Sequence, residues 1–190
     1  MLEVLRRIVQ EVDNAPSFQA ALDVLVASVR EATHTEVCSV YLLDDRTERL
    51  VLMANEGFNP SSIGVVSLGF GEGLVGLCAT REEPINLQDA ATHPSYVYFP
   101  ETGEERYNAF LGVPIMNRRK VLGVLVVQQF ENRRFDEGEV AFLVTLSAQL
   151  SGVVAHAKVM GQLEGVRGSR ATPTQTYQGI TGATGVTLGR

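Results

Sequence analysis

Residues 108–135 read NAFLGVPIMNRRKVLGVLVVQQFENRRF and hold the densest apolar content of the chain. Two runs rich in β-branched residues are separated by the polar tetrad 117–120, which predicts an antiparallel hairpin. With Arg118 and Arg119 at the centre of the turn, Leu111 faces Val126 and Val113 faces Val124. Both faces of this hairpin are largely apolar, so both must be covered by other parts of the chain.

A sheet covered on its two sides by different layers can hold a cavity in one of them. Pro114 has no amide hydrogen to donate and falls opposite Gly123 in this register, which predicts a bulge or a non-bonded pair there. The sequence leaves open which face is the floor of the cavity. That choice decides whether Gln128 or Gln129 points toward it.

The chain before the hairpin predicts two helices and a second hairpin. Apolar residues recur at helical spacing over 2–13, and Ser17 is placed to cap a second helix that ends near residue 33. Residues 37–43 and 49–55 are predicted strands around a polar turn. Residues 63–68 are predicted as a further short strand.

The middle of the chain is glycine-rich and then irregular. Residues 69–73 approach a predicted short helix over 74–79, and residues 84–87 form a brief extended segment. Residues 88–107 form a long irregular stretch rich in aromatic and charged residues. Such a loop inside a compact domain is usually functional, so we interpret it as a lid.

The last helix begins with a strong local signal. Asp136 is placed as the N-cap with Glu139 as its capping-box partner, and leucines continue at three- and four-residue steps to about residue 163. Residues 164–176 then read as a flexible linker. The glycine-rich stretch 177–190 is too short to form a domain, and we interpret it as the first residues of a second domain.

Composition excludes several classes of protein. With 190 residues and 45% hydrophobic residues, the chain can bury the core of one ordinary domain. Its net charge of −6 argues against non-specific binding to nucleic acid. No uninterrupted apolar run approaches the ~20 residues of a membrane span, and no signal peptide is recognisable. We therefore expect a soluble cytoplasmic protein that binds neither nucleic acid nor membrane.

The order of these elements resembles that of a GAF domain. The resemblance covers roughly residues 17–160 and is carried by the segments GEGLVG (71–76), EPINLQDA (83–90), FLGVPI (110–115), VLGVL (121–125) and FDEGE (135–139). It implies an α+β fold, with a mostly antiparallel sheet of about six strands. Terminal helices would pack on one face, and a small-molecule pocket would lie on the other under loops and short helices.

A narrower resemblance is to the N-terminal region of the nitrogen-related phosphoenolpyruvate–protein phosphotransferases. It rests on segments such as LRRIVQEV (5–12), VCSVYLL (37–43), TGEERY (102–107) and GITGATGVTLG (179–189), although those enzymes usually have a proline where Thr184 stands. It implies a regulatory domain over residues 1–163, a linker, and the start of a truncated phosphotransferase module. The implied signals are glutamine and 2-oxoglutarate, and a small carrier protein would accept the phosphoryl group.

Eight residues are candidates for the ligand site. Arg106 lies at the mouth of the expected pocket, where a guanidinium can clamp a carboxylate with two parallel hydrogen bonds. The alternative for Arg106 is an ion pair with a neighbouring glutamate. Ser39 and Tyr41 share one face of the first strand, which the sequence does not assign to the pocket or to the helices. The other candidates belong to the lid or adjoin it: Asp89, His93, Tyr96, Tyr98 and Tyr107.

No catalytic, metal or cofactor site is expected. Cys38 and Cys78 are widely separated and are interpreted as small buried hydrophobic residues, and the three histidines are dispersed. Two alternatives to the regulatory domain remain. One is a free-standing GAF enzyme of the methionine-sulfoxide-reductase type, which needs a reactive thiol. The other is a structural dimerisation module built from the terminal helices. A homodimer is expected.

Overall fold

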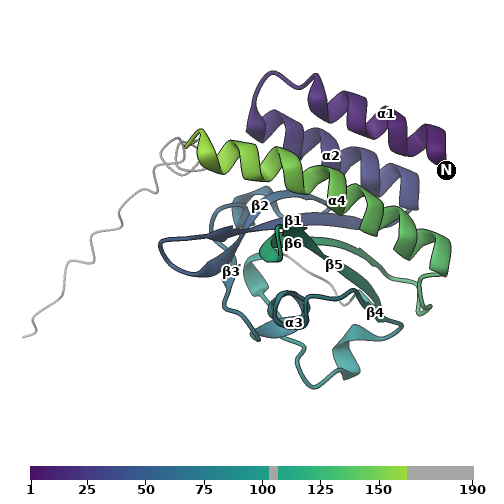
Figure 1. Ribbon diagram of the computed structural model, residues 1–190. Coiled ribbons are helices and arrows are strands. Elements are labelled where there is room, and N and C mark those ends of the chain that lie inside the picture. Colours follow the sequence, from purple (N-terminus) through teal and green to yellow (C-terminus); the bar gives the residue numbers. More distant parts are fainter. Residues whose placement is uncertain (103–106, 162–190) are drawn as a thin grey trace, which may run out of the picture.

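Six antiparallel strands form one sheet at the centre of the molecule. The computed structural model describes residues 1–102 and 107–161, and its sheet has the strand order β3-β2-β1-β6-β5-β4 (Figure 1). The strands are β1 (Val37–Asp44), β2 (Arg49–Glu56), β3 (Ser67–Leu68), β4 (Ile85–Leu87), β5 (Ala109–Asn117) and β6 (Lys120–Gln129). The helices are α1 (Leu2–Asp13), α2 (Phe18–Thr33), α3 (Gly73–Arg81) and α4 (Glu137–Val159), with short 3₁₀ helices at Pro60–Ser62, Ala90–Thr92 and Pro100–Thr102. The expected α+β fold is confirmed.

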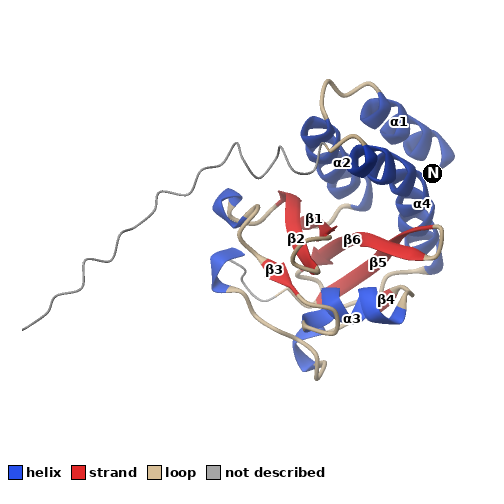
Figure 2. Cartoon of the chain, turned by 60° about the vertical axis from the view of Figure 1, so that its left-hand side comes forward, coloured by secondary structure: helices blue, strands red, loops and turns tan. Residues whose placement is uncertain are grey.

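The two faces of the sheet carry separate layers. Helices α2 and α4 lie on one face with α1 outside them, whereas α3 and the short helices lie on the other (Figures 1 and 2). The first layer buries Leu111, Val113 and Leu125 together with the helices. The second buries Phe110 and Val124 together with α3. The prediction that both faces of the central hairpin are covered is therefore confirmed.

The register of that hairpin differs from the predicted one beyond its first residues. Met116 pairs with Val121 as expected, but the register shifts at Ile115, which pairs with Gly123. Leu122 is thus an extra residue on β6, a β-bulge that lies beside Pro114 rather than on it. Because the bulge reverses the sides of the following residues, the predicted pairs of Leu111 with Val126 and of Val113 with Val124 are wrong: Leu111 faces Val127 and Val113 faces Leu125.

The turn of the hairpin is made by two arginines in the left-handed region. Arg118 has φ 48° and Arg119 has φ 64°, the conformation of a two-residue turn that usually takes asparagine or glycine. The charged side chains at this tip are exposed to water, and the turn lies where the polar tetrad 117–120 predicted it.

The segment between β2 and α3 contains less strand than predicted. Of residues 63–68, only Ser67 and Leu68 pair with β2, opposite Val51 and Leu50. The preceding residues turn back on themselves instead, since the N–H of Val66 bonds to the carbonyl of Ser62. Gly64 and Val66 still bond to Leu52 of β2, through the N–H of Gly64 at 2.7 Å and the carbonyl of Val66 at 2.9 Å, but this local turn interrupts the predicted strand before Ser67.

Helix α4 is the longest helix and packs along the sheet. Its predicted capping box is present: the Asp136 carboxylate accepts from the N–H of Glu139, and the Glu139 carboxylate accepts from the N–H of Asp136, each at 2.8 Å. By length and composition alone, α4 is apolar enough to cross a membrane. A core helix passes the same test, and Leu143, Leu146 and Leu150 of α4 are buried in the first layer. The predicted extension to residue 163, and the segments 164–176 and 177–190, lie outside the described residues.

One arginine fastens the connection between β6 and α4. Arg133 donates to both carboxylate oxygens of Glu139, at 2.9 and 2.8 Å, and to the side-chain oxygen of Gln129 at 3.0 Å. The hydrogen bonds from Arg133 lower the pKa of Glu139, and those to Glu139 raise the pKa of Arg133. The pair therefore stabilises the fold while Glu139 is ionised.

This pair predicts a pH-dependent contribution to stability. Because the folded pKa of Glu139 lies below its ordinary value, the contribution is complete above pH ~4.3 and is lost as the pH falls through the folded value. Arg133→Gln is expected to lower the free energy of unfolding by about 1 kcal/mol at pH 7. The difference from wild type should close in acid, as measured by urea unfolding at several pH values.

Glu139→Gln is the matched control because it keeps the capping geometry and removes the charge. It should lose a similar amount at pH 7 and converge with wild type over the same acid range. A gap between Arg133→Gln and wild type that stays constant down to pH ~3 would show that the ionised pair is not its source.

Candidate functional site

A small cavity lies on the face of the sheet away from α1, α2 and α4. Its volume is about 40 Å³. It is lined by the strands, by the first turn of α3 and by the lid: Tyr41, Phe58, Leu68, Gly73, Leu74, Val75, Tyr96, Val97, Phe99, Thr102, Phe110 and Gln128. The position agrees with the pocket that the sequence predicted.

Three strands supply the floor of the cavity. Phe110 of β5 lies opposite Gln128 of β6, and directly opposed residues of an antiparallel pair share a face. Tyr41 of β1 lies on the same face because its partner Val124 belongs to the second layer. All three floor side chains are less than a tenth exposed. Gln128, rather than Gln129, therefore faces the cavity.

The first turn of α3 forms one wall. Glu72 is its N-cap residue but makes no capping bond; its carboxylate accepts from the N–H of Gly69 at 2.8 Å and pairs with Arg49 at 3.2 Å. The start of a helix has N–H groups without intrahelical partners and attracts negative charge. Residues 73–75 present this start to the cavity.

Glycine is required where this wall meets the sheet. Gly73 has φ +65°, and a Cβ there would lie 2.8 Å from Cδ2 of Leu68. A side chain would also enter the space beside Val97 of the lid. The glycine of this motif thus allows α3 to begin close against both the sheet and the lid.

The lid closes the cavity from outside. Thr102 is buried and donates from its hydroxyl to the carbonyl of Phe99 at 2.7 Å. The carbonyl of Thr102 accepts from the N–H of Asn59 at 2.8 Å, which ties the lid to the loop that carries Phe58. In contrast, Val97 is 41% exposed. The lid is thus hydrogen-bonded at one end and forms a thin cover at the other.

The partly open cavity is too small for an ordinary metabolite. Pockets that hold such ligands have volumes of several hundred Å³, whereas each water molecule needs about 10–15 Å³ by the same measure. A volume of about 40 Å³ accommodates a few waters. Any metabolite that enters must therefore displace part of the lid.

Two of the eight predicted site residues line the cavity, namely Tyr41 and Tyr96. Ser39 faces the same side of the sheet but is fully buried, where its hydroxyl accepts from the Asn55 amide at 2.7 Å. Tyr107 does not line the cavity but contacts Phe58, which does. The centroid of its ring lies 6.2 Å from that of Phe58, and 4.6 Å from that of Phe130, on which it is stacked.

Three of the other predicted residues, Asp89, His93 and Tyr98, are not part of the lining. Asp89 precedes the short helix at Ala90–Thr92, and the ring nitrogen Nδ1 of His93 accepts from the N–H of Ser95 at 3.1 Å. Tyr98 is half exposed. Arg106 lies outside the described residues, so its role as a carboxylate clamp stays a prediction.

Sequence reasoning missed most of the apolar lining. Phe58 and Phe99 come from irregular segments whose periodicity gives no orientation. The GEGLVG segment carries the family resemblance, but the sequence did not identify its residues 73–75 as a wall of the cavity. The sequence feature that could have identified this wall is the start of a helix directly after a glycine-rich turn.

Burial suppresses the reactivity of both thiols. Cys38 and Cys78 are free and fully buried. Desolvation raises the pKa of Cys38 well above the usual thiol range and raises that of Cys78 to about 12. Since the thiolate is the nucleophile, neither residue has the environment of a reactive cysteine. Within the described residues, no group of three potential ligands could hold a metal ion.

Comparison with known proteins agrees with this geometry. The GAF domain model matches residues 17–154. The chain belongs to the GAF domain family.

Among GAF domains, it is of the kind carried by phosphoenolpyruvate–protein phosphotransferases. The GAF domain of such an enzyme from Coxiella burnetii is 47% identical with a TM-score of 0.81, and one from Acinetobacter is 51% identical with a TM-score of 0.77. In both cases the match covers 85% of this chain and 96% of the other.

A protein from Salmonella typhimurium described as "Phosphoenolpyruvate-dependent phosphotransferase system" is 46% identical over 97% of this chain. The chain spans about a quarter of the length of that relative. A free methionine-R-sulfoxide reductase from Neisseria meningitidis shares the fold, with 23% identity, a TM-score of 0.72, and coverage of 84% of this chain and 90% of that one.

Proposed function

We propose that this chain is the regulatory, ligand-sensing GAF domain of a phosphotransferase of the nitrogen phosphotransferase system. It performs no chemical step itself. It controls the transfer of a phosphoryl group from phosphoenolpyruvate to a carrier protein by phosphotransferase domains further along the same cytoplasmic polypeptide. The observation that carries the proposal is the cavity, with Tyr41 and Gln128 in its floor, on the face of the sheet opposite the terminal helices.

The lining favours a small amino acid or 2-oxoacid. The start of α3 suits a carboxylate, because its N–H groups and helix dipole favour negative charge. Gln128 carries both donors and an acceptor, and the hydroxyls of Tyr41 and Tyr96 add further polar partners. The remaining wall is apolar and suits a short aliphatic chain. Glutamine and 2-oxoglutarate, the signals implied by the family resemblance, are the first candidates.

A row of aromatic rings leads from the cavity to the end of β6, where the connection to α4 begins. Phe58 lines the cavity and contacts Tyr107, whose ring is stacked on Phe130. The Asn108 side chain holds the carbonyl of Phe130 at 2.6 Å, just before the Arg133 connection. Displacement of the lid would therefore change contacts near the start of α4. A ligand regulates in this way only if it binds two conformations unequally.

Calorimetry tests the proposal. The chain is titrated with glutamine, 2-oxoglutarate, the other amino acids, further 2-oxoacids and cyclic nucleotides. Saturable binding of an amino acid or 2-oxoacid is expected, with a stoichiometry of one per chain. Absence of binding across this panel would remove ligand sensing from the proposal.

Gln128→Leu is expected to weaken that binding by about 10- to 100-fold, because the ligand then leaves a polar group unpaired in a buried site. Leucine has a similar size, so the floor stays filled. Gln88→Leu, at an exposed position outside the lining, is the matched control and should retain wild-type affinity. Equal affinity of Gln128→Leu and wild type would place the ligand elsewhere.

A sulfoxide-reductase function receives no support from the thiols. The likeness to the Neisseria meningitidis reductase concerns the fold, and the raised thiol pKa values oppose the nucleophilic attack that such a reaction requires.

A further inference from the structure

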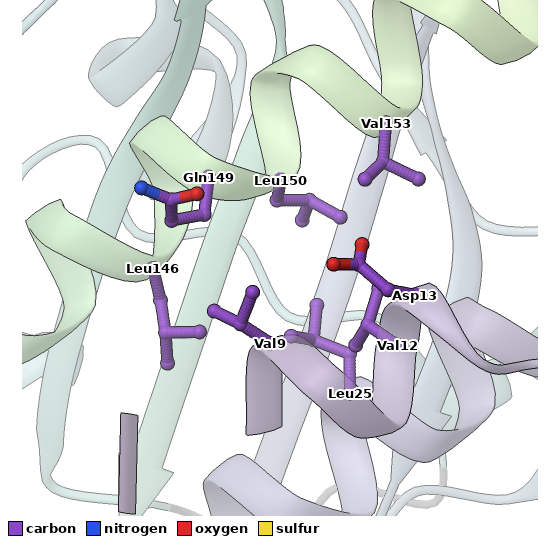
Figure 3. Close-up of a pocket in the computed structure, with 8 residues that line it drawn as sticks. All are labelled: Val9, Val12, Asp13, Leu25, Leu146, Gln149, Leu150 and Val153. Atoms are coloured by element: carbon purple, nitrogen blue, oxygen red, sulfur yellow. The ribbon is translucent and has the colours of Figure 1, made fainter. Parts of the chain in front are cut away.

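Helix α4 is held in place along its length. Figure 3 shows Leu146, Leu150 and Val153 of α4 lining a narrow pocket opposite Val9 of α1, and this pocket has a volume of about 50 Å³. Toward the sheet, Leu143 of α4 is fully buried in the first layer. Because α4 packs on both α1 and the sheet, the position at which it ends is fixed relative to the strands.

The end of α4 meets the turn between β1 and β2 (Figure 1). Lys158 donates to the two carboxylate oxygens of Asp45 in that turn, at 3.1 and 3.2 Å. Val159 and Met160 follow and are 84% and 60% exposed. This chain covers 25% of the Salmonella typhimurium relative, and in the proposed function the phosphotransferase domains come after this point.

A cluster of positive charge lies at the same end of the sheet. Strands β1 and β6 are adjacent and antiparallel, with Leu42 opposite Gly123, so the turn after β1 and the turn before β6 lie at one end. The turn before β6 is the tip of the central hairpin. It carries three exposed cationic residues, Arg118, Arg119 and Lys120, which we call the basic tip.

The basic tip has no partner within its own domain. In residues 1–102 and 107–161, none of its three side chains forms a hydrogen bond or an ion pair. In the turn after β1, Asp45 is paired with Lys158, and the Asp44 carboxylate accepts hydrogen bonds from its own turn. Glu48 is the remaining carboxylate of that turn and is exposed. The three cations of the tip therefore outnumber the carboxylate left beside them, on a chain whose net charge is −6.

The conformation of the basic tip is unfavourable for the residues that occupy it. Arg118 and Arg119 both have positive φ, where a side chain crowds the backbone, and asparagine followed by glycine is preferred in such a turn. Adjacent like charges add repulsion. The fold gains no side-chain contact in return. A strained segment of this kind indicates a role in binding.

We propose that the basic tip, together with Val159 and Met160, docks on an acidic surface of the phosphotransferase region of the same polypeptide. This inference rests on the proposed function, which places that region after this chain. Arginine and lysine pair with carboxylates, and the exposed apolar residues at the same end of the sheet add buried area. Docking where α4 ends holds the regulatory domain against the region that it controls.

Carbodiimide coupling of amines to carboxylates tests the proposal in the complete polypeptide, which contains this chain and the phosphotransferase domains. The chain contains two lysines: Lys120 is exposed, whereas the Lys158 side chain is 16% exposed and paired with Asp45. Peptide mass spectrometry is expected to find Lys120 joined to Asp or Glu beyond residue 190. The product that joins Lys158 to Asp45 is the internal control for the reaction.

Two results would overturn the proposal. In the first, Lys120 is joined only to residues 1–190, or to nothing although the control product forms. In the second, a mixture of isotope-labelled and unlabelled polypeptide gives Lys120 products that join a labelled peptide to an unlabelled one, which assigns the basic tip to a second copy.

The variant Arg118→Asn/Arg119→Gly separates docking from a purely structural role. It is expected to lower the yield of Lys120 products about fivefold or more. It should also raise the melting temperature of the 190-residue chain by about 2–4 °C, because the strained residues are replaced by the preferred pair. Arg6→Gln/Arg81→Gln removes two exposed charges elsewhere and should keep the wild-type yield. A yield that is unchanged in the tip variant would reject the contact.

Docking and ligand sensing fail separately in these experiments. The coupling reaction needs no metabolite, and calorimetry on the 190-residue chain needs no phosphotransferase region. Metabolite binding without the Lys120 products would overturn docking alone. The Lys120 products without metabolite binding would overturn ligand sensing alone.

Discussion

Gly123→Ala is expected to destabilise the domain by about 3 kcal/mol or more. Gly123 follows the bulge of β6 and pairs with Leu42 of β1 and Ile115 of β5. A Cβ at this position would lie 2.1 Å from the carbonyl oxygen of Tyr41 and 2.9 Å from Cδ2 of Leu42. The first neighbour is backbone in a central strand, so it cannot turn away as a side chain can.

The same substitution at Gly152 is the matched control. Nothing lies within 4 Å of the position that a Cβ would take at Gly152, which is in the exposed part of α4. Gly152→Ala should therefore stabilise the protein by up to about 1 kcal/mol through helix propensity. Urea unfolding of the two variants should give changes of opposite sign. A loss of less than about 1 kcal/mol for Gly123→Ala would mean that β1 and β6 separate more easily than their pairing indicates.

Asn86→Ala is expected to lower the free energy of unfolding by about 3 kcal/mol, since it leaves two backbone groups without partners. The Asn86 side chain donates to the carbonyl of Phe135 at 2.8 Å and accepts from its N–H at 3.1 Å. The side-chain amide thus pairs with the backbone of Phe135 as a neighbouring strand would, and it ties the segment before α4 to β4. Phe135 is only 3% exposed, so water cannot readily replace these bonds.

Gln88→Ala provides the comparison on the same edge of the sheet. Its amide donates to the side chain of Asn132 at 2.6 Å, and both residues are exposed. Its loss should change stability by less than about 0.5 kcal/mol. Equal effects of the two substitutions in thermal and urea unfolding would contradict the bridging role of Asn86. A further readout is hydrogen exchange in the first turn of α4, which Asn86→Ala should accelerate.

The sequence allowed the layers to be predicted more reliably than the register. The helical spacing of apolar residues, the cap at Asp136 and the apolar residues on both faces of 108–135 are local features of the sequence. They have the same role in the folded structure. The bulge at Leu122 is not such a signal. It depends on how β6 meets β5 and β1 together, and one extra residue moved Leu125 to the other face.

The candidate site was predicted less completely than the fold. Tyr41 could be grouped with Ser39 on one face of its strand, but that face could not be assigned to the cavity or to the helices. Strand alternation gives only the relative orientation of neighbouring residues. The lid residues could be recognised as a group, yet which of them turn inward depends on tertiary contacts such as that between Asn59 and Thr102. Tyr96 lines the cavity while Tyr98, two residues later, is exposed.

The two cysteines lie in different layers, Cys38 with the helices and Cys78 with α3. Because both thiols are fully buried, an alkylating reagent can reach each one only when its own layer opens. The reaction rate of each thiol therefore measures the opening equilibrium of one side of the sheet. The two thiols are thus built-in probes of local opening, Cys78 for the cavity side of the sheet and Cys38 for the helical side.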